Sequence, residues 1–205
     1  NRVETEEDFP RDVQELQRLL APAQAGQPIV AVPGAGTNVP IWLLGSSLFS
    51  AQLAAYLGLP YAFASHFAPR MLHQALAIYR QTFKPSAALA KPYAIVGVPV
   101  IAAPTDAEAQ FLASSTYQRV LGILTGNRTR LQPPVEGFME QVSERERAAI
   151  ADFLAVGIIG GPQTVRAGLQ ALAQATQADE FMLVSDVFDA DLRLRSLQLT
   201  AQAMV

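Results

Sequence analysis

The sequence contains no cysteine and little charge. Asp, Glu, Lys and Arg together make up 16% of its 205 residues, well below the usual ~25%. Without cysteine the chain has no disulfides, no cysteine–zinc sites and no thiol catalysis. The lack of thiols suits a cytoplasmic protein, which is the location we expect. The low charge fraction predicts that much of the surface is buried, in a deep core or against a partner, and it favours a homodimer.

Basic clusters and long apolar runs are also missing. The net charge is −3, so the basic patch of a nucleic-acid-binding protein is lacking and we expect no nucleic-acid partner. The longest apolar run, residues 94–103, is interrupted by Gly97 and Pro99 and is too short to span a membrane. We expect neither a signal peptide nor membrane association. There are two histidines, His66 and His73, without a cluster of carboxylates around them, so we expect no metal site.

What the sequence does have is a core-forming composition in which apolar runs alternate with helical patterns. Half of the residues (50%) are hydrophobic, enough for one sizeable core. The main strands are predicted at 40–45, 60–66, 93–102 and 180–187, the third bent at Pro99. Strands that alternate with helices imply βαβ units and a parallel sheet. Their apolar character fits strands that are buried on both faces.

Other segments are assigned from capping and turn signals. Capping boxes at 105–108 and 143–146 predict two helix starts, and Pro162 predicts another at its first helical position. A short strand is predicted at 29–32, and 125–138 is interpreted as a long irregular lid. Helices are predicted at 10–20, 51–57, 68–83, 105–124, 143–156, from 162 onward, and 192–203.

The turn after the first main strand is the most informative local feature. Its sequence is Gly45-Ser46-Ser47, followed by a helix that contains Ser50. A helix start presents free N–H groups and partial positive charge, so these hydroxyls could form a phosphate cradle. Gly45 would let a ligand approach the backbone closely. Serine is also a preferred N-cap without any ligand, and the residues alone leave both interpretations open.

The next strand ends in Ala64-Ser65-His66. A neutral imidazole can act as a general base near neutral pH, so His66 is the catalytic candidate, although a structural histidine at a strand end is the alternative. Ala64 and Ser65 share this rim, where small residues would admit a flat ring. Two further anion sites are considered, Gly160-Gly161-Pro162 and the pair Arg128 and Arg130. The alternatives are a turn into a helix and a solvated loop.

Several of these motifs together resemble one family, the bacterial-luciferase-like flavin-dependent monooxygenases. The resemblance is carried by the run Val39–Pro69 and by later stretches, and it covers nearly the whole chain. The later stretches are Leu131-Gln132-Pro133-Pro134-Val135, Gly160-Gly161-Pro162-Gln163-Thr164-Val165 and Ala178-Asp179-Glu180-Phe181-Met182. The resemblance implies an α/β fold, a (β/α)8 TIM barrel of which residues 1–205 supply the C-terminal half. We therefore expect a single domain of about four βα units that is incomplete at its N-terminus.

The resemblance also implies a function. Reduced FMN and O2 would oxygenate a small organic substrate, and a flavin reductase would be a possible partner. In this family the serine turn holds the FMN phosphate, and Ser47 and Ser50 fall at the matching positions, with Ser46 and Gly45 beside them. Ala64 and Ser65 would line the flavin pocket. The alternatives are a non-catalytic flavin-binding relative and a reductase that uses the deazaflavin F420.

Overall fold

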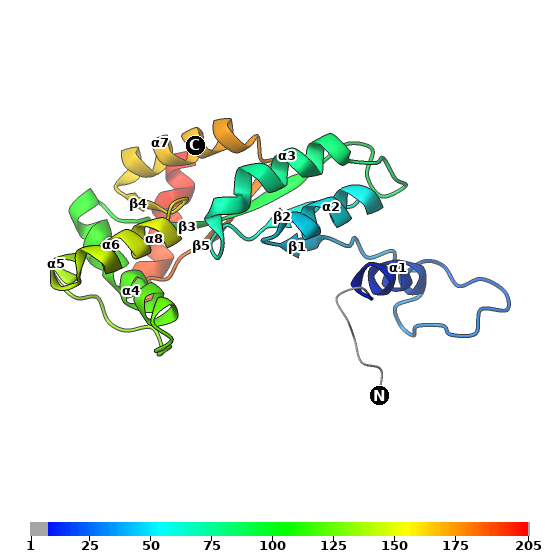
Figure 1. The fold of residues 1–205 in the computed structure, drawn as a ribbon, viewed down its shortest axis with the longest axis horizontal. Helices are drawn as coiled ribbons and strands as arrows, with labels where there is room; N and C mark the ends of the chain where they lie inside the picture. The colour runs from blue at the N-terminus through cyan, green and yellow to red at the C-terminus, as the bar shows by residue number, and fades with distance from the viewer. Residues whose placement is uncertain (1–7, 205) are drawn as a thin grey trace.

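Residues 8–204 are described by a computed structural model in which helices alternate with parallel strands (Figure 1). The strands are β1 (Leu43–Gly45), β2 (Tyr61–Phe63), β3 (Ala94–Ala102), β4 (Ile158–Gly160) and β5 (Glu180–Val184). The helices are α1 (Phe9–Leu20), α2 (Leu48–Leu57), α3 (Leu72–Thr82, after the 3-10 turn Pro69–Met71), α4 (Asp106–Leu124), α5 (Phe138–Gln141), α6 (Glu144–Phe153), α7 (Pro162–Thr176) and α8 (Ala190–Met204).

All five strands belong to one sheet in which every pairing is parallel. β1 pairs with β2, and β2 pairs with β3. β3 also pairs with β5, in which Val184 lies opposite Pro99, and with β4, which begins with Ile158 opposite Val100. Proline has no N–H to give to a strand ladder, so the predicted irregularity at Pro99 coincides with a change of partner.

The two faces of the sheet are in different environments. On one face, Leu43, Tyr61, Phe63 and Val96 pack into the main core, and in Figure 1 α2 and α3 lie over this side of β1 and β2. Helices α7 and α8 contribute to the same core through Val165, Leu169 and Ala203.

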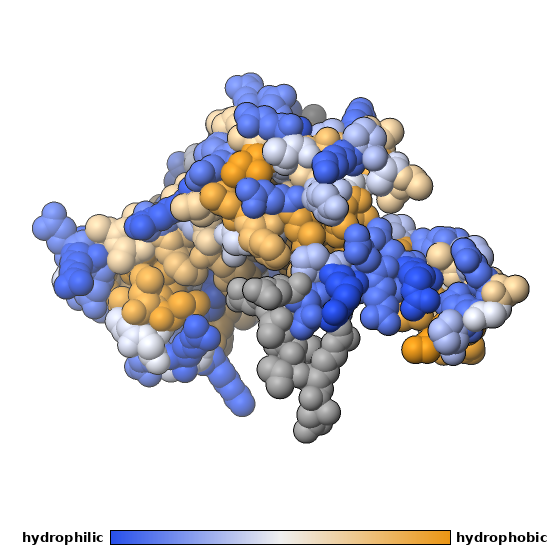
Figure 2. Space-filling model, turned by 45° about the vertical axis from the view of Figure 1, so that its right-hand side comes forward, coloured by the Kyte–Doolittle hydropathy of each residue, from blue (hydrophilic) through white to orange (hydrophobic). Residues whose placement is uncertain are grey.

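The opposite face, here called the uncovered face, carries apolar side chains in register. Leu44 is 70% exposed and Met182 is 59% exposed. β1 and β5 are therefore buried on one face only, which differs from the predicted burial on both. The space-filling view shows apolar patches among polar residues on the visible surface (Figure 2). The apolar members of the uncovered face are Trp42, Leu44, Ala62, Ile95 and Met182.

Two sequence assignments differ from the structure. Residues 29–32 do not form a strand, and Val32 is 86% exposed. Among the described residues no strand pairs with this short apolar run, so its pattern alone does not make it a strand. Residues 158–160, where the sequence analysis predicted no strand, form β4, which pairs with the end of β3. The α/β class and the parallel main strands are confirmed.

The predicted helix starts follow their caps. Ser143 and Glu146 form a complete capping box at α6, and the Thr105 side chain accepts a hydrogen bond from Glu108 N at α4. A second core lies where α4 and α6 meet the end of β3, around Ile101, Val120 and Ile150. No helix within residues 8–204 is long and apolar enough to cross a bilayer.

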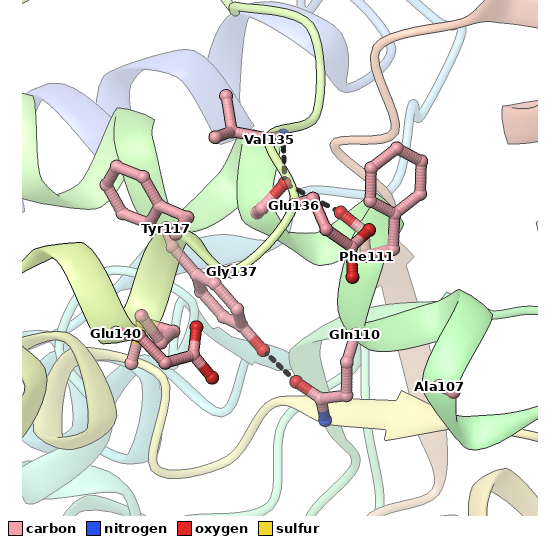
Figure 3. Close-up of a pocket in the computed structure, with 11 residues that line it drawn as sticks. Ala107, Gln110, Phe111, Tyr117, Val135, Glu136, Gly137 and Glu140 are labelled. Atoms are coloured by element: carbon pink, nitrogen blue, oxygen red, sulfur yellow. Dashed lines mark hydrogen bonds between the residues drawn. The ribbon is translucent and has the colours of Figure 1, made fainter.

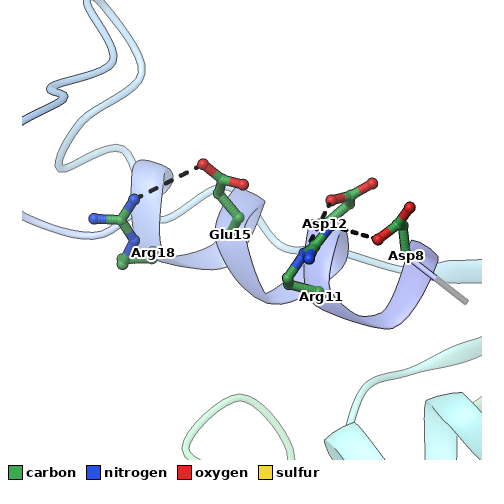
Figure 4. A network of polar contacts seen from close by, with 5 residues as sticks. All are labelled: Asp8, Arg11, Asp12, Glu15 and Arg18. Carbon is green, nitrogen blue, oxygen red and sulfur yellow. Dashed lines mark hydrogen bonds and ion pairs between the residues drawn. The ribbon is translucent and has the colours of Figure 1, made fainter. Parts of the chain in front are cut away.

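Helix α1 lies apart from the sheet, beyond β1 (Figure 1). Its exposed side carries the network shown in Figure 4, where Arg11 pairs with Asp8 and Asp12, and Arg18 lies 3.9 Å from Glu15. Exposed pairs of this kind contribute little to stability.

Candidate functional site

The serine turn and the end of β2 lie side by side. Ala64 N donates to Gly45 O at 2.9 Å, which continues the β1–β2 ladder by one residue. Both segments follow the carboxyl ends of parallel strands, the end at which α/β barrels carry their sites. The structure therefore brings the two segments selected from the sequence to one place.

The serine turn is held together by its own hydroxyls. Ser47 is the N-cap of α2, and its Oγ accepts a hydrogen bond from Ser50 N at 3.2 Å. Ser50 Oγ in turn accepts from Ser47 N at 3.4 Å and lies 3.0 Å from the Tyr61 hydroxyl. Tyr61 is fully buried, and burial raises the pKa of its phenol. Ser47 and Ser50 therefore have a structural role as a capping box, whatever they bind.

Glycine is needed at position 45 because a side chain there would clash with Ser50, and not because a ligand needs the space. A Cβ at Gly45 would lie 2.3 Å from Ser50 Oγ. The groups left for an anion are elsewhere on the turn. The Ser46 hydroxyl is half-buried and has no hydrogen-bond partner within residues 8–204, and the amides of Leu48 and Phe49 lie in the first helical turn, where no intrahelical acceptor exists.

Ala64 and Ser65 lie beneath the rim. Both side chains are buried, and the Ser65 hydroxyl donates to Gly97 O. This bond ties the end of β2 to the middle of β3. Contact of these two side chains with a flavin ring stays a prediction, because here their contacts are with the protein.

His66 is half-buried and packs against Gly97, where an added Cβ would lie 2.5 Å from its Nδ1. That Nδ1 is buried and has no hydrogen-bond partner in the described part of the chain. Burial lowers the pKa of His66, Arg119 lowers it further, and Asp186 opposes the shift. The imidazole is therefore neutral at neutral pH and can act as a hydrogen-bond donor or acceptor.

The two charged groups near His66 were not found from the sequence. Arg119 lies on α4 and Asp186 follows β5, and Arg119 donates to Asp186 Oδ2 at 2.5 Å. Both side chains are 28% exposed. Arg119 Nε is buried and makes no hydrogen bond to the described residues. The sequence did show polar residues after each main strand, and Asp186 is one of them. It gave no sign that this residue pairs with Arg119, which lies 67 positions earlier in the chain.

Beside this ion pair lies a hollow of about 400 Å³, here called the arginine pocket. Of the predicted anion-binding candidates, Arg128 lines it and Arg130 does not. It is lined by Phe67, Arg119, Ile123, Arg128, Thr129 and Phe153.

A second hollow of about 290 Å³ lies between α4 and residues 135–140 (Figure 3). There the Tyr117 hydroxyl donates to Gln110 Oε1 at 2.5 Å, and the carboxylates of Glu136 and Glu140 line the wall. The irregular segment predicted at 125–138 runs along α4, where Val135 N donates to Ser114 Oγ at 2.7 Å. The described residues contain no cluster of three or more metal-ligating side chains.

The start of α7 is already bound by a carboxylate of the protein, that of Asp106. Asp106 Oδ1 accepts from Gly161 N at 2.6 Å, and hydrogen bonds from Gly161 and Thr164 lower the pKa of this carboxyl. The Gly160-Gly161 turn therefore serves as a helix start joined to α4, the alternative considered for it above.

Comparison with protein-family models gives a match to the luciferase-like monooxygenase family over residues 3–179. The chain belongs to this family. It is 46% identical over 200 residues to the uncharacterized protein YvbT of Bacillus subtilis (strain 168), covering 97% of this chain and 60% of that protein. It is 45% identical over 193 residues to a protein named luciferase-like monooxygenase from Escherichia coli (strain K12), covering 94% of this chain and 58% of that protein.

A solved structure agrees with this assignment. The crystal structure of apo-MsnO8 matches with a TM-score of 0.79 at 32% identity, covering 97% of this chain and 61% of that one. The chain thus spans about 60% of the length of these relatives. The resemblance identified from the sequence is confirmed, and so is the fold class, a luciferase-like barrel of which this chain matches a part.

Proposed function

We propose that this chain binds the phosphate of reduced FMN in a monooxygenase that oxygenates a small organic substrate with O2. The observation that carries the proposal is the Ser46 hydroxyl, which is unpartnered within residues 8–204 and stands beside the first-turn amides of α2 at the carboxyl ends of the strands. Helix starts of this kind bind phosphate. Family membership supports the monooxygenase class.

The choice of FMN over F420 rests on the relatives. Solved proteins that share the fold use either cofactor. One is the oxygenating constituent of 3,6-diketocamphane monooxygenase in complex with FMN (19% identity, TM-score 0.54, 89% of this chain and 54% of that one). Another is the coenzyme F420 dependent tetrahydromethanopterin reductase of Methanopyrus kandleri (15% identity, TM-score 0.57, covering 94% of this chain and 61% of that one). The FMN protein is named a monooxygenase, as this chain's family is, and the F420 protein is named a reductase.

The groups of the site divide the work as follows. Ser46, with the amides of Leu48 and Phe49, holds the phosphate, and the Ser47–Ser50 capping box keeps those donors in place. His66 presents a neutral imidazole at the same rim, where it can hydrogen-bond to the cofactor or substrate. Bound reduced flavin supplies the electrons for O2 activation. We further propose a homodimer, a flavin reductase as the source of the reduced cofactor, and a cytoplasmic location.

A titration with FMN and riboflavin tests the phosphate role. The two ligands differ by the phosphate, so wild-type chain should bind FMN about tenfold more tightly, as expected for charge-assisted hydrogen bonds. Ser46→Ala should reduce this preference about threefold, since one neutral donor is lost, and leave riboflavin affinity unchanged. Equal affinity for FMN and riboflavin would refute the proposal, and tighter binding of F420 than of FMN would favour the reductase.

Oxygen consumption separates an enzyme from a non-catalytic flavin-binding relative. The chain is supplied with FMN, NADH and a flavin reductase, and O2 uptake is followed with and without candidate substrates. Uptake above the autoxidation of free reduced flavin, together with an oxygenated product, is the expected result. Uptake at the autoxidation rate with FMN bound would identify a flavin-binding protein without this activity.

A further inference from the structure

We infer that the arginine pocket binds the anionic end of the substrate, so the substrate class is an organic anion with an apolar body. The inference rests on the proposed function for the statement that the bound molecule is a substrate. The binding itself depends on the pocket alone, and the two can be tested separately.

The charge of the pocket is positive. Arg119 and Arg128 both line it, and Asp186 is the carboxylate that pairs with Arg119. Arg128 makes no hydrogen bond or ion pair with any residue from 8 to 204. One guanidinium therefore remains uncompensated, and its planar fork matches the oxygens of a carboxylate, sulfonate or phosphate.

Arg119 supplies a second, independent observation. Its Nε is buried and lacks a partner among the described residues, although another nitrogen of the same guanidinium donates to Asp186. Buried donors are nearly always satisfied, so a guanidinium with one occupied and one unsatisfied nitrogen indicates a missing acceptor. A ligand oxygen in the arginine pocket would reach that nitrogen only if the Arg119 side chain turned toward it, because the nitrogen is buried.

The remaining wall is apolar. Phe67, Ile123 and Phe153 line the pocket, and its volume of about 400 Å³ lies in the ~300–1,000 Å³ range of small-molecule sites. Phe67 also packs on His66, with 4.2 Å between ring centres. The pocket therefore adjoins the rim at which the reaction is proposed, and one molecule can place its charge at Arg128 and its apolar part along Phe67.

The test uses octanoate and 1-octanol, which have the same chain length and differ in charge, titrated calorimetrically into the full chain. Octanoate should bind about tenfold more tightly, as expected for a charge-assisted contact, and 0.5 M salt (roughly a 4 Å Debye length) should reduce the difference. Arg128→Gln should abolish the preference, and Arg128→Lys should retain part of it. Arg130→Gln is the matched control, because Arg130 lies in the same segment without lining the pocket.

The outcomes separate the inference from the proposed function. Equal binding of octanoate and 1-octanol, or equal effects of Arg128→Gln and Arg130→Gln, overturns the inference and leaves FMN binding at the serine turn untouched. Loss of FMN affinity in Arg128→Gln without loss of octanoate affinity also overturns it, since the pocket would then hold the cofactor phosphate. Arginine-dependent octanoate binding in a chain that binds no FMN supports the pocket and contradicts the proposed function. Arg128 is exposed, and circular dichroism melts confirm that each variant is folded.

Discussion

Substitution of Gly45 by alanine tests the packing of the serine turn most directly. The added Cβ would lie 2.3 Å from Ser50 Oγ and 2.4 Å from Ser50 Cβ, so Ser50 must move. Its movement breaks the capping box with Ser47 and the contact with the buried Tyr61 hydroxyl. Overpacking costs about 1–3 kcal/mol, and loss of the cap costs about 1 kcal/mol.

The expected loss is therefore about 3 kcal/mol of unfolding free energy, measured by urea denaturation and by thermal melts followed by circular dichroism. For a chain of this size the melting temperature should fall by about 6–12 °C. The matched control is Gly161→Ala, because a Cβ there meets its nearest atom at 3.5 Å with an ordinary φ of −69°. That change should cost under about 1 kcal/mol.

A double-mutant cycle identifies the cause. Ser50→Gly removes both atoms that the new Cβ would meet, so Gly45→Ala should cost less than about 1 kcal/mol in that background, a coupling of roughly 2 kcal/mol. If Gly45→Ala costs the same with serine and with glycine at position 50, the reasoning about Ser50 is wrong and the glycine is needed for another reason.

The remaining predictions concern buried polar contacts. Ser65→Ala should lower the unfolding free energy by about 1–3 kcal/mol, because a buried carbonyl loses its donor; an unchanged urea midpoint would contradict this. Tyr79→Phe should cost about 1–3 kcal/mol, since the buried hydroxyl donates to Leu59 O and also accepts from a backbone amide; the control is the exposed Tyr56→Phe, which should leave the midpoint unchanged. The lowered pKa of His66 means that the unfolded chain binds the proton more readily, so stability present above about pH 6.5 should be lost as the pH falls towards the folded-state value. His66→Gln should flatten that dependence between about pH 7 and 5, and a profile identical to wild type would show that this histidine does not contribute.

Much of the fold follows from local pattern. The run at 94–102 is apolar and rich in β-branched residues, and it forms the central strand. The capping residues Thr105 and Ser143 mark their helix starts because a helix cap is a contact between residues close in sequence. In contrast, Ile158-Ile159-Gly160 is too short to show a period, and it is a strand because β3 continues past Pro99 and pairs with it from Val100 to Ala102.

The position of the candidate site could be predicted from the sequence, but the contacts of its side chains could not. The serine turn and the end of β2 were found because each follows a main strand. The burial of Ser65 depends on a carbonyl 32 residues away, and the position of Arg119 depends on a carboxylate 67 residues away. Neither distance leaves a pattern in a single sequence. Trp42 is 38% exposed, and nothing in the sequence distinguishes a residue facing helices from one facing the opposite side of the sheet.

The uncovered face has a practical consequence for work in solution. Leu44 and Met182 on this face are more than half exposed in the folded chain, and an apolar surface of this kind attracts amphiphilic dyes as readily as a partner. A fluorescent reporter of hydrophobicity should therefore be bright before any heating, and its signal should fall when a mild detergent competes for the sheet.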